Sequence, residues 1–483
     1  MEFTPLKHII FVPGPACGHL RPGLKTTLRM VEKFPNLFIS VFVYPTEAPK
    51  AIGYLGAQTH SYSNRIKIVT ASRKEVPPPV NAGGPVNMLA YMEESFRLWV
   101  ATELCFTGHA ELCHGTGILE RLAQYQAGAH GEENLDAGAS EVYLQVFKAL
   151  HIENDEEDDN FYLLPQNVSN RFIRIPGLPA IHEWELNPQY LPFIPAFLGF
   201  EIPRIKNIIK QVDIIVFGTT FEMEPISASS LLTAFDVHLT PFFIGPSVDL
   251  VSTHRVNPNS PVTRFLDRTY TEKGAHSVIY IAFGTAFFPL PSSMSRLMAA
   301  VEEVPKAGLR FIFALSSAKA KVDQSWMDAH IERGNAIFPE WTNQTAVLEH
   351  PAIHYFLSHG GWNSSTEALV RGVPMIFWPF IGDQPTNAMQ IATVHDCGFE
   401  LLQVWIGPAK STAYQNGAEV KVVGTDNAVR GEMKRILELS KEPRGEHQRT
   451  NVRMMGKVVT ESLALGESGD LGLDKFGKAL SLA

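Results

Sequence analysis

Short apolar runs that alternate with helical stretches constrain this chain more than any other feature of its sequence. Each run has the length and the apolar character of a buried strand, and turn residues such as Gly and Pro bound it. In the first half of the chain these runs are residues 8–13, 38–45, 65–72, 212–218 and 242–245. Strands that alternate with helices form right-handed βαβ units around a parallel sheet. The predicted fold class is therefore α/β, with doubly wound Rossmann-like sheets.

The alternation resumes in the second half. The predicted strands there are residues 277–284, 310–315, 353–357 and 374–378, and helices are expected from about residue 426 onward. Residues 247–262 are polar and aperiodic and contain two prolines, so they are predicted to be an interdomain linker. We therefore expect an N-terminal domain over residues 1–250 and a C-terminal domain over residues 251–465. The last helix, residues 466–483, is expected to pack back on the N-terminal domain.

Composition excludes several classes of protein. The chain has 483 residues, 45% of them hydrophobic, and a formal net charge of −9, which argues against a nucleic-acid partner or a strongly anionic membrane surface. No pair of its cysteines has the spacing of a zinc or redox site. No basic leader or long apolar segment predicts a signal peptide or a transmembrane helix. We expect a cytoplasmic protein, and a monomer is the default assumption.

Residues 105–160 break the strand–helix rhythm. They are rich in Gly, Ala, Gln and Glu, and they contain the acidic run at residues 154–160. These carboxylates could be interpreted as a metal site for a diphosphate. Because they lie in one unpatterned run, a solvated loop is the preferred interpretation, and no metal or other cofactor is expected.

The densest group of candidate functional residues lies at residues 341–384. A predicted strand runs into Ser358-His359-Gly360-Gly361, and a helix is expected to begin near Asn363. Glycines allow a ligand to approach the backbone, and a helix start offers amide groups and partial positive charge to an anion. The alternative is a plain helix cap, because Ser364 and Glu367 match the S-x-x-E capping box. The residues alone leave both interpretations open.

The whole of this window resembles, without insertion, the nucleotide-sugar signature of family 1 glycosyltransferases, the UDP-glycosyltransferases. The resemblance extends to residues 18–22, 175–179, 212–225 and 280–285, and in overall character it is nearest to the fungal members. It implies the GT-B fold, in which two doubly wound Rossmann-like domains face each other across a cleft. It also implies a UDP-sugar donor and a small-molecule acceptor as partners.

The resemblance assigns a role to each donor-site residue. Trp341 would stack on the uracil, although it could instead be a core aromatic. Gln344 would line the base and ribose pocket, and Glu367 would accept hydrogen bonds from the two ribose hydroxyls. Asp383 and Gln384 would bind the hydroxyls of the sugar, and Asp383 could also cap a helix. The diphosphate would contact His359, Asn363 and Ser364, the loop amides near Gly361 and Trp362, and the backbone of Gly284 and Thr285.

His19 is the candidate catalytic base. On its own, a histidine in a glycine-containing turn indicates a capping or surface residue, but the run GHLRP at residues 18–22 resembles the catalytic-histidine motif of the family. His19 would remove a proton from the acceptor hydroxyl as its oxygen attacks the anomeric carbon and UDP departs from the opposite face, so the configuration inverts. His350 and His354 are interpreted as structural or surface residues.

The chain departs from the family in two respects. The aspartate that usually orients the base is expected within residues 105–150, where no apolar strand ends in Asp, so we name no partner for His19. A catalytically weak or inactive UDP-sugar-binding protein is therefore the alternative function, and a nucleotide-sugar epimerase is disfavoured by the long signature. Gln384 favours glucose as the donor sugar, but Ile381 stands where many plant members carry an aromatic residue, so xylose stays open.

The acceptor is predicted only by chemical class. Residues 77–85 and 99–106 are apolar and aromatic and correspond to acceptor-binding loops. They suggest a small lipophilic molecule such as a terpenoid, sterol or phenolic natural product.

Overall fold

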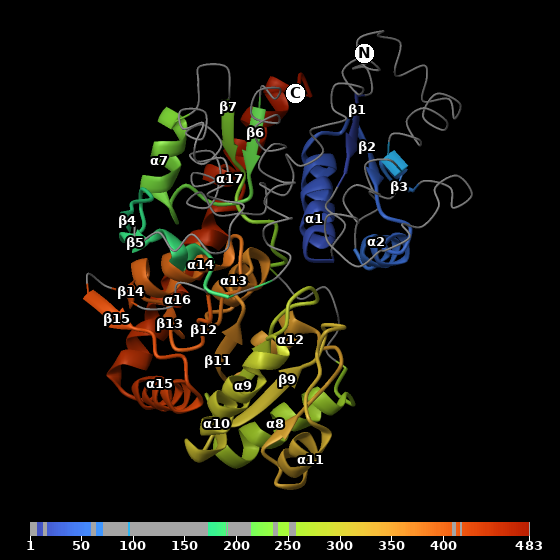
Figure 1. Cartoon of the computed structure of the whole chain (residues 1–483). Helices are drawn as coiled ribbons and strands as arrows, with labels where there is room; N and C mark the ends of the chain where they lie inside the picture. Colours follow the sequence, from blue (N-terminus) through green and yellow to red (C-terminus); the bar gives the residue numbers. More distant parts are fainter. Residues whose placement is uncertain are drawn as a thin grey trace.

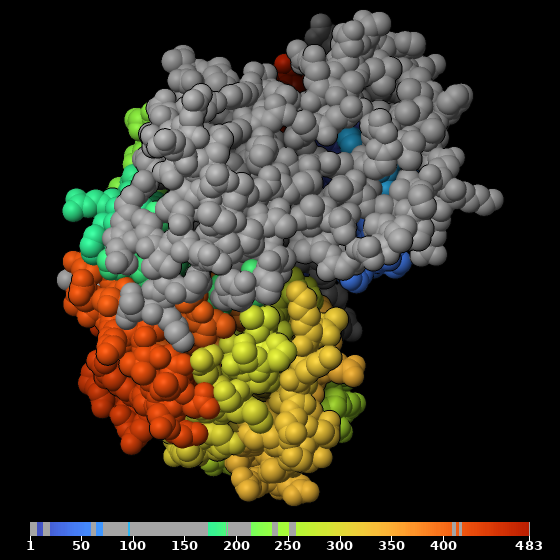
Figure 2. Space-filling view, in the orientation of Figure 1, coloured from blue at the N-terminus to red at the C-terminus, as the bar shows by residue number. Residues whose placement is uncertain are grey.

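The structure is a computed structural model that describes residues 7–12, 17–58, 64–70, 95–96, 172–189, 191, 214–234, 240–250, 257–407, 412–415 and 418–482. Figure 1 shows the C-terminal sheet and its helices in the lower part, and the elements of the N-terminal half above them with the last helix of the chain. In the space-filling view, the C-terminal half, coloured from yellow to orange-red, forms the lower part of the visible face (Figure 2). Among the described residues, no helix combines the length and apolar character that spanning a membrane requires.

A six-stranded parallel sheet organises the C-terminal half. Its spatial order is β10 (Ala336–Ile337), β9 (Arg310–Ala314), β8 (Val278–Ala282), β11 (Ile353–Ser358), β12 (Met375–Phe377) and β13 (Gly398–Glu400). Relative to the order in the chain this is the 3-2-1-4-5-6 arrangement of the Rossmann fold. The order reverses between β8 and β11. In such sheets ligands bind beyond the carboxyl ends of the two strands that flank the reversal.

Both faces of this sheet are buried. On β8, Ile279 and Ile281 belong to one apolar cluster, whereas Val278 and Tyr280 belong to the cluster on the opposite face. Alternate side chains of a strand point to opposite faces, so a continuous apolar run fits a sheet that helices cover on both sides. The helix α8 (Pro261–Lys273) precedes the first of these strands. The α-helices between the strands are α9 (Met294–Val301), α10 (Glu303–Lys306), α11 (Gln324–Glu332), α12 (Gln344–Leu348), α13 (Trp362–Val370) and α14 (Gln384–Ala388).

Parallel strands also form the described N-terminal half. The first sheet is β1 (Lys7–Phe11), β2 (Leu37–Phe42) and β3 (Ile66–Val69), and a separate parallel pair is β6 (Ile214–Phe217) and β7 (Thr240–Phe243). The helices of this half are α1 (Cys17–Lys33), α2 (Ala48–Gly56) and α7 (Pro225–Ala234). Along α1, Leu20, Leu24, Leu28 and Val31 are buried. This spacing forms the apolar stripe of a helix that packs on a sheet.

The chain ends with α15 (Asp426–Leu439), α16 (Pro443–Ser462) and α17 (Ser468–Ala479). The last of these lies beside β6 and β7 in Figure 1, and Leu473 joins Phe242 and Val216 in one buried cluster. A Cβ atom at Gly472 would stand 2.0 Å from the backbone oxygen of Phe243. Only glycine therefore permits this close contact between α17 and β7.

The structure adds elements that periodicity did not predict. These are β10 and β13, the antiparallel pairs β4 (Phe172–Ile173) with β5 (Ile181–His182) and β14 (Thr412–Gln415) with β15 (Ala418–Lys421), and the short helices η6 (Glu183–Leu186), η7 (Pro291–Ser293) and η8 (Met389–Val394). Most are too short to show a period. The predicted linker was too long at its end, because Pro261 and Val262 open α8 and Ser260 caps it. The expectations for residues 77–94 and 97–160 lie outside the described residues.

Candidate active site

Two glycine-containing loops meet at the point where the strand order reverses. Gly284 follows β8 with φ +72, and His359 follows β11. A Cβ atom at Gly284 would stand 3.2 Å from Nε2 of His359, and one at Gly361 would stand 2.6 Å from the same atom. The two glycines therefore make room for the imidazole between the loops.

The His359 imidazole is held in its neutral form. Burial lowers the pKa of His359 to about 4, and its Nδ1 atom is buried with no hydrogen-bond partner among the described residues. The ring of Phe287 lies alongside it, with the ring centroids 6.3 Å apart. A neutral imidazole has one N–H donor and one acceptor nitrogen. His359 is therefore suited to donate a hydrogen bond to an anionic oxygen without carrying a charge of its own.

The start of α13 differs from the predicted capping box. The helix begins at Trp362 with Gly361 in the N-cap position and no side-chain cap, so Ser364 and Glu367 lie inside the helix and the capping-box interpretation was wrong. The carboxylate of Asp383 instead accepts a hydrogen bond from the backbone N–H of Trp362 at 3.2 Å. Asp383 occupies the N-cap position of α14, but its side chain does not cap that helix.

Further contacts fix the Asp383 carboxylate in this position. The side-chain amide of Asn387 donates to Asp383 at 2.7 Å and to the carbonyl oxygen of Gly360 at 2.9 Å. One carboxylate thus satisfies the first amide of α13, and the amides of Asn363 and Ser364 follow in the same turn. The positive end of the helix dipole is oriented toward the loop that carries His359.

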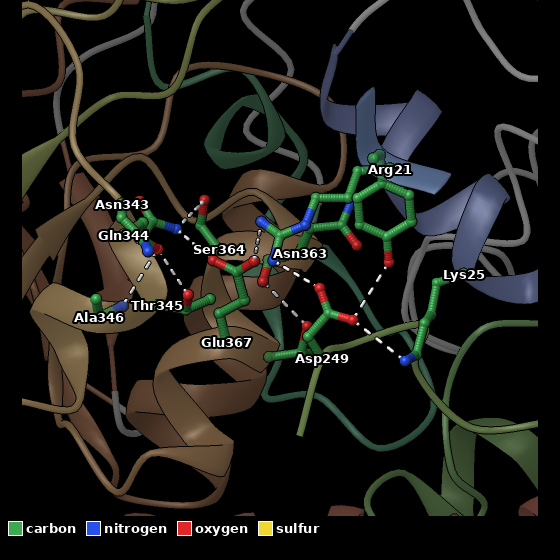
Figure 3. A network of polar contacts seen from close by, with 12 residues as sticks. Arg21, Lys25, Asp249, Asn343, Gln344, Thr345, Ala346, Asn363, Ser364 and Glu367 are labelled. Atoms are coloured by element: carbon green, nitrogen blue, oxygen red, sulfur yellow. Dashed lines mark hydrogen bonds and ion pairs between the residues drawn. The ribbon is translucent and has the colours of Figure 1, made fainter. Parts of the chain in front are cut away.

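Glu367 and Gln344 form a hydrogen-bonded pair of polar side chains at the site (Figure 3). The Nε2 group of Gln344 donates to Oε2 of Glu367 at 2.8 Å, and the Tyr280 hydroxyl donates to Oε1 of Gln344 at 3.3 Å. Glu367 is 7% exposed, and its other oxygen lies 2.8 Å from Nη1 of Arg21. The carboxylate is therefore held by one partner on each of its oxygens.

Trp341 lies three residues before Gln344 in the chain, and 66% of its surface is exposed. The next residue, Thr342, is buried and hydrogen-bonds to the Tyr280 hydroxyl at 2.8 Å. The backbone is thus fixed while the indole remains open to solvent. The interpretation of Trp341 as a core aromatic was wrong, and an exposed indole suits stacking on a planar ring.

Three other predicted donor-site residues have different surroundings. The Trp362 indole is 3% exposed and donates to the carbonyl oxygen of Gly218 at 2.9 Å, so it joins α13 to the loop after β6 and does not face the open site. Gln384 is 4% exposed, and its Oε1 accepts from the backbone N–H of Phe380 at 2.9 Å. Thr285 is exposed in the turn after β8.

The N-terminal side of the site is α1. His19 lies in its first turn, and its side chain is outside the described residues. Sequence reasoning assigned no role to Arg21, although the run GHLRP contains it; its guanidinium contacts both Glu367 and Asp249 at 2.8 Å. Asp249 was also missed, because it lies in the polar segment that we took for a plain linker.

The two histidines interpreted as structural or surface residues make contacts away from the site. His354 is 3% exposed and hydrogen-bonds to Ser440 at 2.9 Å, and burial lowers its pKa to about 3. The Nε2 atom of His350 lies 3.1 Å from Asp267 on α8.

The fold is that of the GT-B class. The chain superposes on the structure of *Phytolacca americana* UGT2 complexed with UDP-2fluoro-glucose and pterostilbene with a TM-score of 0.70, at 17% identity over 98% of this chain and 100% of that one. It superposes on *Medicago truncatula* UGT71G1 complexed with UDP-glucose with a TM-score of 0.66, at 18% identity over 99% of this chain and 98% of the other. At such identities the likeness establishes the fold.

Sequence comparison finds a similarity to UDP-glycosyltransferases over part of the chain. Residues 204–403 match the family model described as UDP-glucoronosyl and UDP-glucosyl transferase. The chain is 30% identical to the UDP-glycosyltransferase eriJ of *Hericium erinaceus* over 49% of this chain and 48% of that protein. It is 26% identical to UDP-glycosyltransferase 74C1 of *Arabidopsis thaliana* over 62% of this chain and 63% of that protein. The alignments thus span about half to two thirds of these relatives, and over these regions the chain is similar to UDP-glycosyltransferases.

Proposed function

We propose that this protein is an inverting glycosyltransferase that moves a sugar from a UDP-sugar to the hydroxyl of a small lipophilic acceptor. The observation that carries the proposal is the set Trp341, Gln344 and Glu367 beside His359 at the reversal of the strand order. An exposed indole can stack on a uracil, and a carboxylate can accept hydrogen bonds from both hydroxyls of a ribose. The neutral His359 and the positive end of α13 would then contact the diphosphate attached to that ribose.

In this mechanism the donor side stabilises the leaving group. As the bond between the anomeric carbon and the β-phosphate oxygen breaks, negative charge grows on the diphosphate. His359 would donate a hydrogen bond to it, and the amides of Asn363 and Ser364 would add the partial charge of the helix start. These groups supply the electrostatic stabilisation, so the proposal includes no metal ion. Treatment with EDTA is expected to leave UDP release unchanged.

The acceptor side supplies the base. His19 would take the proton of the acceptor hydroxyl while its oxygen forms the new bond to the anomeric carbon from the face opposite UDP, which inverts the configuration. Two relatives support a phenolic acceptor. The anthocyanidin 3-O-glucosyltransferase 1 of *Manihot esculenta* is 24% identical over 77% of this chain, and the flavonoid 3-O-glucosyltransferase of *Medicago truncatula* is 28% identical over 82%. The proposed acceptors also include terpenoids and sterols.

The test is a two-stage assay. Calorimetry first measures UDP binding, and then UDP release is followed with UDP-glucose or UDP-xylose as donor and quercetin, a hydroxylated terpenoid or a sterol as acceptor. The proposal expects UDP binding and acceptor-dependent release, with a β-linked product from an α-linked donor. Binding with no turnover by any donor and acceptor pair would instead favour a UDP-sugar-binding protein without catalysis, and absence of UDP binding would contradict both functions.

A further inference from the structure

One guanidinium connects the two halves of the molecule at the site. Arg21, on α1, lies 2.8 Å from Oδ2 of Asp249 through Nη2 and 2.8 Å from Oε1 of Glu367 through Nη1 (Figure 3). Glu367 is the carboxylate that the proposed function assigns to the ribose. A side chain of the acceptor side therefore contacts a nucleotide-binding group of the donor side directly.

Asp249 is a fixed anchor for this guanidinium. Its side chain is 2% exposed, and it also contacts Lys25 at 3.2 Å and the Tyr54 hydroxyl at 3.2 Å. At the end of α13, Arg371 donates to the backbone oxygen of Asp249 at 3.0 Å. Burial raises the pKa of the Asp249 carboxyl, but the hydrogen bond from Arg21 and the charge of Lys25 outweigh it, so the pKa lies below its usual value. The anchor is therefore charged at neutral pH.

The first turn of α1 depends on such an anchor. Pro22 lies inside the helix, and a proline has no N–H to donate to the carbonyl four residues earlier, which belongs to Gly18. The turn that carries His19 is therefore joined to the rest of α1 by an interrupted hydrogen-bond ladder. Arg21 directly precedes the interruption, and its ion pairs connect this turn to two carboxylates outside α1.

The contact with Glu367 is compatible with a bound nucleotide. A carboxylate offers about four lone-pair positions. Arg21 occupies one on Oε1 and Gln344 one on Oε2, so each oxygen retains a position for a ribose hydroxyl. A nucleotide can thus bind Glu367 without displacing Arg21, and the carboxylate would be shared by the ribose and the base-bearing turn.

We propose that Arg21 is a positioning residue that couples the ribose-binding carboxylate Glu367 to the turn of α1 that carries the base His19. This inference rests on the proposed function and adds a residue to it. The ion pairs of Arg21 keep the turn at a fixed position relative to the donor. The base therefore faces the acceptor oxygen only when α1 and α13 are joined. The ion pair acts on turnover, whereas the donor is bound by Trp341, Gln344 and Glu367.

The experiment compares Arg21→Gln with Lys25→Gln in the full chain. Lys25 lies one turn further along α1 and also contacts Asp249, but it does not contact Glu367 among the described pairs. UDP affinity is measured by calorimetry, thermal stability by the unfolding midpoint, and kcat and the donor KM by UDP release from UDP-glucose with quercetin as the probe acceptor. Arg21→Lys tests rescue by a shorter cation that cannot bridge two carboxylates with a planar fork.

For Arg21→Gln we expect kcat to fall about 10- to 100-fold, the loss typical of a misplaced reacting group, while the donor KM and UDP affinity change by less than about threefold. Arg21→Lys should recover part of kcat, and Lys25→Gln should retain wild-type kcat within about twofold. An unchanged kcat in Arg21→Gln would overturn the inference. So would tighter UDP binding with faster turnover, because Arg21 would then compete with the ribose, or equal losses of kcat and stability in both variants.

The two proposals fail in different ways. If the wild-type protein does not bind UDP, the proposed function falls and this inference falls with it. If the wild-type protein binds UDP and turns over but Arg21→Gln behaves like the wild type, only the coupling by Arg21 is wrong.

Discussion

The helices α13 and α1 meet at one site but are held in different ways. The start of α13 is held mainly by its own half of the chain, because Asp383 bonds its first amide and Gln344 orients Glu367, and the Trp362 indole adds one hydrogen bond to Gly218 of the other half. The first turn of α1 precedes a helix-interrupting proline, and Arg21 connects it to Asp249 and Glu367. The donor side is therefore preorganised mainly within its own half, whereas the base side is placed by contact between the halves.

This difference indicates which half of the molecule should control nucleotide affinity and which should control turnover. A site built mainly from one sheet and its loops depends less on the neighbouring half for its geometry. A base that depends on contacts between the halves is sensitive to how they fit together. Changes on the donor side should therefore act on nucleotide affinity, and changes on the α1 side should act on turnover.

The largest expected effect comes from His19→Ala. If His19 is the base, kcat should fall by roughly 10²- to 10⁴-fold, while UDP affinity measured by calorimetry stays unchanged. His350→Ala, in which a histidine that contacts Asp267 on α8 is lost, serves as the control and should retain turnover. A large loss of UDP affinity in His19→Ala would break the comparison, because the base side would then also bind the donor.

Glu367→Gln should have the next largest effect. A hydrogen bond to a charged group contributes about 1.5–3 kcal/mol, so loss of the carboxylate should weaken UDP binding by about 10- to 100-fold. The change also leaves Arg21 with only Asp249, so kcat should fall as well. Glu438→Gln, at an exposed position on α15, is the matched control. Wild-type UDP affinity in Glu367→Gln would show that the carboxylate does not contact the ribose.

Trp341→Ala separates donor affinity from stability. Stacking of a base on an aromatic side chain contributes about 1–3 kcal/mol, so UDP affinity should fall by about tenfold. Because the indole is 66% exposed, the unfolding midpoint should stay within a degree or two of the wild type, as for other exposed positions. Trp341→Phe should retain part of the affinity. A large drop in the unfolding midpoint would mean that the indole packs against the protein.

The smallest expected effect concerns pH and the sheet beneath the donor site. Burial raises the pKa of Glu400, at the end of β13, to about 7. The native carboxyl is protonated below pH 7 while the unfolded one ionises near 4.5, so its contribution to stability is complete below pH 4.5 and is lost as the pH rises to 7. Glu400→Gln should therefore be more stable than the wild type at pH 8, by about 1–3 kcal/mol, and equally stable at pH 4. Denaturant unfolding at both pH values measures this, and an equal difference at both would contradict a titrating Glu400.

Sequence reasoning was strongest where the pattern was long. The strands β8, β9, β11 and β12 lie within the predicted ranges or extend them by one residue, because a buried parallel strand must be apolar on both faces. It was weakest for the short β10 and β13, which have too few residues to show a period. For the site, the window at residues 341–384 contained the donor-side residues, but the pattern could not show that Trp362 points into the core or that Asp383 caps a different helix.

By itself the sequence determined the alternating α/β architecture, the family resemblance and the glycine-flanked helix start, because apolar periodicity, glycine and a long motif are local properties of the chain. Only the tertiary structure decided that Trp341 is exposed, that Asp383 bonds the first amide of α13, and that Arg21 joins Glu367 to Asp249. Asp249 is 228 residues from Arg21 in the chain. No local pattern encodes such a contact, because it exists only when packing brings the two halves together.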